Sequence, residues 1–454
     1  MKKDYYLYVG QDKKEYFVLP ARWVPLHFVE AEESAEVPSI EQMTREALLK
    51  PTGTPPFQTM LSGVKQIAII VDDGTRPTPV AQILGVLLSH LEEGGFSREN
   101  ISIVVAVGTH ASMKQEALEA RLGSGVVSRY KVVQHNAKGD LVPIQISGHG
   151  RAIKINPAVA QAGFKVGISS VLPHPMAGYG GGPKILMPGI SDFEFIREHH
   201  MTYGFHPRSV AGVTKGNPFH EGCLQVARAV GLNFSINCVY NQKGQVIRII
   251  SGSLEMAFAE AVALCFERLG HRFTEKVDVT ITSSFPHTHG PQIMKGLSAP
   301  DVVTKETGAI LLVAPAVAPL PAEFLNSIHV VKEKFRNKPV AYIKDTLSRG
   351  IAPLPDKAID YNMAITSMFL RPKIRTILVS PSVSRNEAET LGFEYSSSLE
   401  QGIGLLERSY PNAKVAIFPS GGLIVPITAW RADIYFPPDD WNQRRDESGY
   451  GDCR

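Results

Sequence analysis

The sequence predicts an α/β protein with two α/β domains, mainly parallel sheets and an active site in the cleft between them. Continuous runs of apolar, β-branched residues recur along the chain, and such runs are typical of strands buried on both faces of a parallel sheet. Segments with helical periodicity separate these runs, which is the order of βαβ units. The length of 454 residues allows two or three domains of ordinary size.

The first half of the chain supplies the N-terminal domain, which we place at residues 1–272 and expect to bind the cofactor and carry the catalytic residues. A strand-rich lead-in is followed by a polar connection. The run KQIAIIV then stops at Asp72, and Pro79 suits the first turn of the next helix. The predicted elements of this half are strands at 65–71, 101–107, 164–173, 234–240 and 245–251 and helices at 80–95, 113–123 and 254–269.

The second half forms a C-terminal α/β domain at residues 273–454, which we expect to contribute substrate-binding residues. The boundary lies where the segment HRFTEK interrupts the apolar pattern. Helix-like segments extend to about residue 370, and the polar tail from residue 436 is expected to be loosely held. The predicted strands of this half are 277–286, 309–315, 375–380 and 414–422.

The composition is that of an ordinary globular protein, with 44% hydrophobic and 20% charged residues. A net charge of +3 without a run of lysines and arginines gives no reason to expect nucleic-acid binding. No apolar stretch reaches the length of about 18 residues that a membrane span needs, and the N-terminus does not resemble a signal peptide. Four scattered cysteines without a CxxC motif suit reduced thiols, so a cytoplasmic location is expected.

Polar residues follow two of the predicted strands. Asp73 and Arg76 come directly after the first strand, and His110 follows the second in a GTH motif. Ligands of α/β proteins collect beyond the carboxyl ends of parallel strands, so these positions favour a functional site. The alternatives are a structural ion pair between Asp73 and Arg76 and a capping or core role for His110.

The most distinctive stretch is HPMAGYGGGPKILMPGISDFEFIREHH, residues 174–200. Four of its glycines fall within five residues, which allows positive φ angles and a close approach of the backbone to a ligand. Lys184 suits an anionic ligand there. The order of a Walker A loop is absent, and the glycines do not follow a dinucleotide fingerprint. A purely structural glycine turn is the alternative.

The candidate residues do not match common catalytic signatures. Neither HExxH nor GxSxG occurs, and several histidines with few carboxylates do not resemble an oxygen-rich magnesium site. By themselves they support acid–base chemistry on a small anion, with an imidazole available for a borderline metal. The residues collected at strand ends or in the glycine loop are Asp73, Arg76, His110, His174, Lys184, His199, His200, Gln292 and Lys295.

These motifs resemble the nickel-dependent lactate racemase family. The matching pieces are DDGTRPTP, GTH, HPMAGYGGGPKILMPGI, the following HH, GNPFHE and QIMK, in family order over about residues 65–300. The resemblance implies a nickel pincer nucleotide, a pyridinium mononucleotide with two sulfur arms and a carbon–nickel bond. By resemblance, Lys184 would join it through a thioamide and His200 would bind nickel. The other implied cofactor-binding residues are Asp73, Thr75, Arg76, Gly180, Gly181, Gly182 and Pro188.

The resemblance also implies a reaction. A hydride moves from C2 of a 2-hydroxy acid to the cofactor while a histidine takes the hydroxyl proton, and the planar 2-keto acid then takes the hydride back on either face. His110 and His174 would be the catalytic pair, one for each enantiomer. Residues implied to bind the substrate are Arg76, Gln292 and Lys295.

One departure concerns the substrate. Pro291 stands where the lactate enzyme has an aromatic hydroxyl, and His287 and His289 add polar groups nearby. A 2-hydroxy acid larger than lactate, such as malate or gluconate, is therefore expected, with lactate itself as the alternative. A non-catalytic cofactor-binding homologue is a further alternative, although a binder needs no paired bases. A nicotinamide-dependent dehydrogenase is not supported, because the dinucleotide-binding fingerprint is absent from the sequence. The expected partners are the substrate and the cofactor-synthesis proteins.

Overall fold

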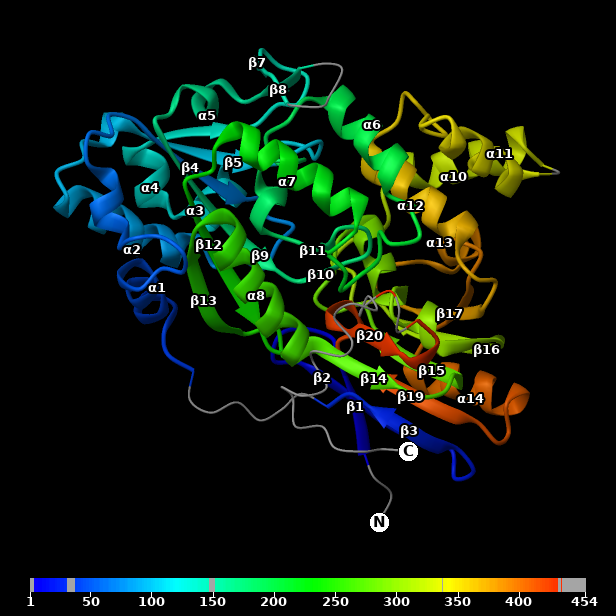
Figure 1. Cartoon of the computed structure of the whole chain (residues 1–454). Helices are drawn as coiled ribbons and strands as arrows, with labels where there is room; N and C mark the ends of the chain where they lie inside the picture. The colour runs from blue at the N-terminus through cyan, green and yellow to red at the C-terminus, as the bar shows by residue number, and fades with distance from the viewer. Residues whose placement is uncertain (1–3, 31–36, 147–151, 337, 432–433, 435–454) are drawn as a thin grey trace.

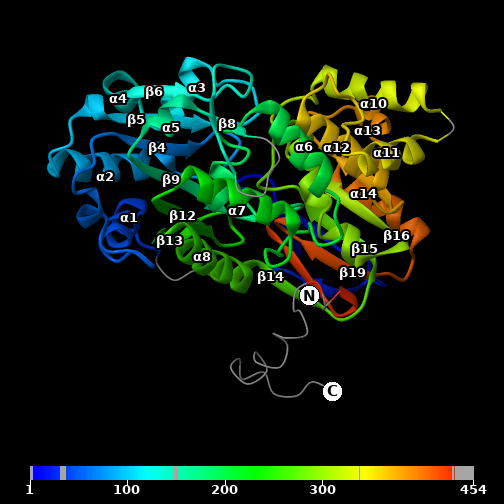
Figure 2. The same cartoon turned by 45° about the horizontal axis from the view of Figure 1, so that its top comes forward.

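The computed structural model describes residues 4–30, 37–146, 152–336, 338–431 and 434, and these form two six-stranded sheets flanked by helices (Figure 1). A second view shows the two sheets in separate halves with α6 (Phe193–Tyr203) and α12 (Ile359–Leu370) at their junction (Figure 2). This confirms the predicted α/β class with mainly parallel sheets. None of the described helices is long and apolar enough to cross a membrane.

The first sheet has five parallel strands and one antiparallel edge strand. The antiparallel pair is formed by the strands predicted at 234–240 and 245–251. In sheet order the strands are β13 (Val246–Gly252), β12 (Phe234–Tyr240), β9 (Phe164–Val171), β4 (Ile67–Asp72), β5 (Ile101–Ala106) and β6 (Lys131–Gln134).

Both faces of the first sheet are covered, which explains its continuous apolar runs. Ile67, Ile69 and Val71 point into one core, while Ala68 and Ile70 point into the other. Helices of the first core are α1 (Ile40–Leu49), α2 (Val80–Glu93), α3 (Gln115–Leu122), α4 (Ser124–Arg129) and α8 (Leu254–Leu269). Those of the second are α5 (Pro157–Gln161), α6 and α7 (Pro218–Val230), beside the small hairpin β7 (Val142–Ile144)–β8 (Ile153–Ile155).

The second sheet is entirely parallel. Its strands, in order, are β18 (Glu394–Ser396), β17 (Arg375–Val379), β16 (Thr304–Val313), β15 (Val277–Ser283), β19 (Lys414–Phe418) and β3 (Val24–Phe28). One face packs on α10 (Ala322–Lys334), α11 (Pro339–Ser348), α12 and α13 (Arg385–Thr390); the other packs on α14 (Leu399–Ser409) and the hairpin β1 (Asp4–Tyr8)–β2 (Lys14–Val18).

The two halves share chain segments. Strand β3 pairs with β19, so residues 24–28 belong to the second sheet although the sequence prediction assigned them to the N-terminal half. Strand β14 (Gly270–Phe273), at the proposed boundary, pairs with β20 (Val425–Thr428). Division of the chain after residue 272 stays a prediction. The polar tail from residue 436 and Cys453 lie outside the described residues.

Candidate active site

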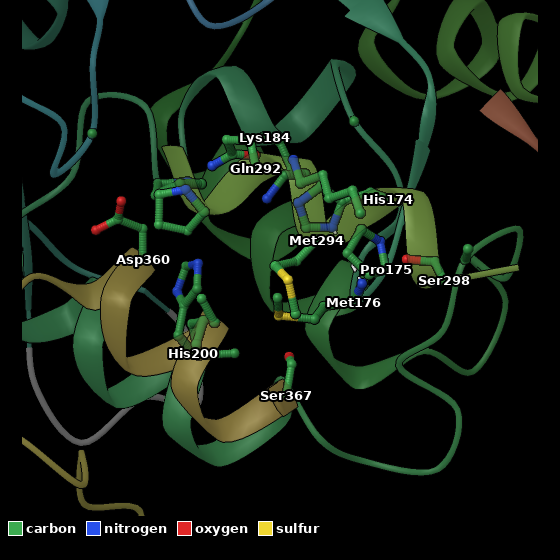
Figure 3. Close-up of a pocket in the computed structure, with 18 of the residues that line it drawn as sticks. His174, Pro175, Met176, Lys184, His200, Gln292, Met294, Ser298, Asp360 and Ser367 are labelled. Atoms are coloured by element: carbon green, nitrogen blue, oxygen red, sulfur yellow. Dashed lines mark hydrogen bonds between the residues drawn. The ribbon is translucent and has the colours of Figure 1, made fainter. Parts of the chain in front are cut away.

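A cavity of about 360 Å³ lies between the two halves, at the carboxyl ends of β4, β5 and β9. Figure 3 shows its labelled side chains, which come from the glycine loop, α6, the segment around Gln292, and α12. Most of the sequence-predicted residues meet here, because parallel strands end at the same edge of a sheet. Those lining the cavity are Asp73, Arg76, His110, His174, Gly180, Gly181, Lys184, Pro188, His200, Gln292 and Lys295.

The loop after β4 holds an Asp–His pair. His110 Nδ1 donates to Asp73 Oδ2 at 2.7 Å. The other carboxylate oxygen, Oδ1, accepts from Thr75 N at 3.1 Å and from Thr75 Oγ1 at 2.5 Å. Arg121 of α3 donates to the carbonyl oxygens of Asp72 and Arg76 and fixes the course of this loop. Thr75 therefore orients the pair without lining the cavity itself.

Asp73 is ionised over the working pH range. Burial alone would raise its pKa, but the hydrogen bond and charge of His110, together with Arg76 and Thr75, hold that pKa well below its usual range. An ionised carboxylate only accepts hydrogen bonds, so His110 must present its protonated Nδ1 to Asp73. In the neutral form of this ring, the other nitrogen, Nε2, carries the lone pair.

His174 begins the glycine loop and is held differently. It lies in the short antiparallel pair β10 (Pro173–His174)–β11 (Gly178–Tyr179). Its Nδ1 accepts from the backbone N–H groups of Met176 and Ala177, at 3.3 and 3.1 Å. Burial and the nearby cations Lys184 and Lys295 lower the pKa of His174 well below its usual value, so the ring is neutral.

The glycine loop packs tightly beneath the cavity. At Gly181, φ is +74° and an added Cβ would lie 2.6 Å from Ser170 O; at Gly182, φ is +50° and an added Cβ would lie 2.3 Å from the Phe258 ring. Gly182 faces α8 rather than the cavity. The Gly180 amide donates to Leu172 O and the Gly182 amide to Ser169 Oγ. These two amides already have protein partners, and the predicted contact of the glycines with a phosphate stays a prediction.

Lys184 projects from the 3-10 turn Gly182–Ile185 into the cavity. Its Nζ lies 5.0 Å from the centre of the Phe219 ring. Burial lowers the pKa of Lys184 to about 8, so a substantial fraction of the amine is neutral near pH 8. A neutral amine is the nucleophilic form that covalent attachment requires.

His200 suits a metal ligand. It lies on α6, which Asp192 caps by accepting from Phe195 N at 2.9 Å. His200 Nδ1 donates to Ile196 O at 2.8 Å, which leaves the Nε2 lone pair free. Burial and Lys184 lower the pKa of His200 to about 3, so the ring is neutral. Metal-binding histidines commonly donate their second N–H to a carbonyl in this way.

The neighbouring residue His199 is placed differently, because it is buried and does not line the cavity. Its ring packs edge-on against Phe219, with the ring centres 4.5 Å apart. The described residues contain no group of three or more His, Cys, Asp and Glu side chains that could hold a metal ion.

Three basic side chains make the cavity suitable for an anion. Arg76, Lys184 and Lys295 line it, and burial together with the other two cations lowers the pKa of Lys295. Gln292, which also lines it, has a buried Oε1 without a hydrogen-bond partner. The cavity thus offers positive charge for a carboxylate and an acceptor for a ligand N–H or O–H.

A smaller cavity of about 140 Å³ adjoins the first and shares Arg76, His174, Gly180 and Lys295 with it. Thr75, His287 and His289 line this second space and not the main cavity. Since His287 and His289 do not line the main cavity, their placement gives no support for direct contact with a longer substrate.

Sequence reasoning missed the contribution of α12. Asp360, Met363, Ala364, Ser367 and Arg371 recur at helical spacing and line the main cavity. Arg371 Nη2 pairs with Asp301 Oδ1 at 2.5 Å. The helical spacing marks a face of this helix, but only the packing of α12 against α6 shows that the face meets the N-terminal half.

Comparison with known proteins adds to this geometry. Residues 11–212 match the family described as the lactate racemase N-terminal domain. The chain is 27% identical over 282 residues to the lactate racemase of Thermoanaerobacterium thermosaccharolyticum and 28% identical over 293 residues to that of Lactiplantibacillus plantarum. The chain is a distant homologue of lactate racemases and carries their N-terminal domain in residues 11–212. Each alignment covers 61% of this chain and 66% of the relative's length.

Solved structures agree on the fold. The lactate racemase apoprotein from Thermoanaerobacterium thermosaccharolyticum superposes with a TM-score of 0.79 at 22% identity, covering 93% of this chain and all of the other. A protein from Thermotoga maritima gives a TM-score of 0.60 at 17% identity, covering 87% of this chain and all of the other. The α/β fold with two mainly parallel sheets is therefore like that of the lactate racemase apoprotein.

The family implies a nickel pincer nucleotide, and the residues of the cavity fit such a group. Lys184 is a buried amine of lowered pKa, and His200 is a neutral imidazole whose Nε2 is free. Both line one cavity with Arg76 and Lys295, whose charges suit an anionic ligand.

Proposed function

We propose that the protein is a racemase or epimerase that inverts C2 of a 2-hydroxy acid through a 2-keto acid intermediate. The observation that carries the proposal is that one cavity contains the Asp73–His110 pair, His174, Lys184 and His200. A protein that only bound a nucleotide would need a lysine or an imidazole there, but not a carboxylate-oriented histidine. Homology to lactate racemases makes an isomerase the expected class.

The cofactor would be a nickel pincer nucleotide joined to Lys184, with nickel bound by His200 Nε2. When bound, it supplies a reversible acceptor for the hydride of C2. Arg76 and Lys295 place positive charge for the substrate carboxylate, and Gln292 adds a polar amide beside them. Holding the reacting groups together in a buried cavity contributes by proximity. Cofactor-synthesis proteins are the partners that this proposal requires.

The chain's own residues handle the hydroxyl group. His110 Nε2 keeps a lone pair that can accept the hydroxyl proton, and the Asp73 carboxylate stabilises the resulting imidazolium. Proton transfer by such a positioned base accelerates a reaction by roughly 10²–10⁴-fold. Removing the proton from oxygen rather than carbon avoids a carbanion next to a carboxylate.

The substrate is proposed to be larger than lactate. Pro291 lines the cavity, and Asp360 and Ser367 add polar groups from α12 that could meet hydroxyls of a longer chain. A sugar acid such as gluconate fits these acceptors better than malate, because a second carboxylate would face Asp360. Lactate racemisation is the alternative for the substrate.

The test is a substrate screen with protein produced together with the cofactor-synthesis proteins. Racemisation or epimerisation of lactate, malate and gluconate is followed by chiral chromatography. We expect gluconate to give the highest kcat/KM. Lactate as the best substrate would contradict the larger substrate, and no turnover by nickel-loaded protein would support a non-catalytic homologue.

A further inference from the structure

We propose that Ser298 and the Asp301–Arg371 ion pair form a subsite that binds hydroxyl groups at the far end of the substrate and so selects a polyhydroxy acid. The inference rests on the proposed function and deepens it, because it names the residues that recognise the substrate beyond its carboxylate and C2. The subsite continues a row of polar side chains that starts at Gln292 and Lys295.

The row follows from the geometry of one segment. The 3-10 helix η4 (Gly290–Leu297) carries its first members, and side chains three positions apart eclipse one another in such a helix. The segment continues through Ser298 into the short helix α9 (Pro300–Val303). The polar side chains that recur at this spacing and line the main cavity are Gln292, Lys295, Ser298 and Asp301.

The other two rows of η4 differ from this polar row. Pro291, Met294 and Leu297 line the same cavity and give it an apolar strip. Ile293 and Gly296 are buried and do not line the cavity. The segment therefore presents a polar strip and an apolar strip side by side, which matches a carbon chain that carries hydroxyl groups.

The spacing along the polar row fits a chain of sugar-acid length. Ser298 N donates to Lys295 O at 3.1 Å, so the 3-10 turn continues to Ser298. The rise of a 3-10 helix places Ser298 roughly 6 Å along the axis from Lys295, which is the length of an extended six-carbon acid. Figure 3 shows Ser298 and Gln292 at the same cavity. A substrate whose carboxylate meets Lys295 can therefore place its terminal hydroxyls near Ser298.

The ion pair offers hydrogen-bonding groups to this end of the substrate. Arg371 Nε donates to Asp301 Oδ2 at 3.0 Å, and Nη2 donates to Oδ1 at 2.5 Å. Thr376 Oγ1 accepts from Nη1 and Nη2 at 3.1 and 3.2 Å. One N–H of Arg371 and a lone pair on each oxygen of Asp301 are then left without a hydrogen-bond partner among the described residues. Both side chains line the cavity, with 11% of Arg371 and 17% of Asp301 exposed.

These groups suit hydroxyls better than other chemical groups. A hydroxyl both donates and accepts, as the pair requires. Because Asp301 neutralises Arg371, the pair favours neutral hydroxyls over a second carboxylate. The Ser298 hydroxyl makes no hydrogen bond to another residue that the structure describes, so it is available to a ligand. An apolar chain end would cover these groups without satisfying them, which costs binding free energy.

The kinetic test compares two acids of equal length. Gluconate and 2-hydroxyhexanoate both have six carbons, but only gluconate has hydroxyls beyond C2. With nickel-loaded protein, kcat/KM should be about tenfold higher for gluconate. Ser298→Ala should lower kcat/KM for gluconate roughly 2–10-fold and Asp301→Asn roughly 10–100-fold, because hydrogen bonds to the hydroxyls are lost. Neither variant should lower kcat/KM for 2-hydroxyhexanoate.

The control variant is Thr376→Val, which removes a partner of Arg371 that does not line the cavity. This variant should keep the preference for gluconate. Equal losses for the two acids in Ser298→Ala and Asp301→Asn would mean that these residues support only the fold, and would overturn the proposal.

Binding to cofactor-free protein tests the subsite without turnover. Isothermal titration calorimetry should show tighter binding of gluconate than of 2-hydroxyhexanoate, and Ser298→Ala should reduce the difference. Equal affinities, or a preference for 2-hydroxyhexanoate, would overturn the subsite and leave the apolar strip to hold the chain. If nickel-loaded protein turns over no 2-hydroxy acid, the proposed function fails, and the difference in binding still decides the subsite.

Discussion

Replacing Asp73 with Asn should convert His110 into a ring without a base toward the cavity. Thr75 donates twice to Asp73 Oδ1, so the Asn side chain must keep its oxygen there and turn its NH₂ group toward His110. The NH₂ group would donate to His110 Nδ1 and shift the ring proton to Nε2. The variant therefore keeps the shape of the site and reverses the tautomer of His110.

The expected loss of kcat follows from the loss of the base. General-base help is worth roughly 10²–10⁴-fold, which is about 2.7–5.4 kcal/mol of activation free energy. Stability should change less, by about 1.5–3 kcal/mol for one charge-assisted hydrogen bond. Since the pKa of Asp73 is lowered by folding, this stabilisation is complete above the unfolded pKa of about 3.9 and is lost as the pH falls through the folded pKa.

The assay is chiral chromatography of the products of nickel-loaded protein, with nitrogen-15 NMR of His110 in cofactor-free protein. The matched control is Asp278→Asn, which removes a carboxylate paired with Lys305 at 2.7 Å outside the cavity. The control should keep its turnover. An Asp73→Asn protein that keeps normal kcat, or whose His110 still carries its proton on Nδ1, would refute the reasoning.

Three further predictions concern the cofactor and the substrate. In cofactor-free protein, reductive methylation of Lys184 should rise with pH and reach half its maximum near pH 8, because burial lowers the pKa of this amine to about 8. Peptide mass spectrometry measures the extent of methylation, and a midpoint near that of an exposed lysine would contradict the lowered pKa. His200→Ala should lose nickel, measured by metal analysis, while its circular dichroism spectrum stays normal; unchanged nickel would point to His199 instead. Asp360→Asn should lower kcat/KM for gluconate about tenfold more than kcat/KM for lactate, because one hydrogen bond to a charged group is lost. Equal losses for both acids would show that Asp360 does not recognise the substrate.

The sequence predicted the sheets and much of the site for one physical reason. Parallel strands end at a common edge, so residues that follow different strands, such as Asp73 and His110, meet although they are far apart in the chain. The glycine loop was also predictable, because Gly181 has a positive φ and no room for a Cβ. Its amides, in contrast, were expected to face a ligand, and two of them bind the protein itself.

Other features depend on long-range packing that local patterns do not encode. Strand β3 joins the second sheet across almost the whole chain, and the cavity-facing side of α12 is defined by its contact with α6. The tautomer of His174 depends on two backbone amides and on Asn217, which are arranged only when α7 docks on the loop. These features have no periodicity or spacing that marks them in the sequence.

The most direct test of hydride transfer follows the C2 hydrogen during racemisation. A single enantiomer of C2-deuterated substrate is incubated in ordinary water with nickel-loaded protein, and the opposite enantiomer is isolated and analysed by mass spectrometry. Transfer of hydride from C2 and back predicts that the inverted product keeps its deuterium. Loss of deuterium to solvent at the rate of inversion would show that the proton leaves carbon, and would contradict the proposed reaction.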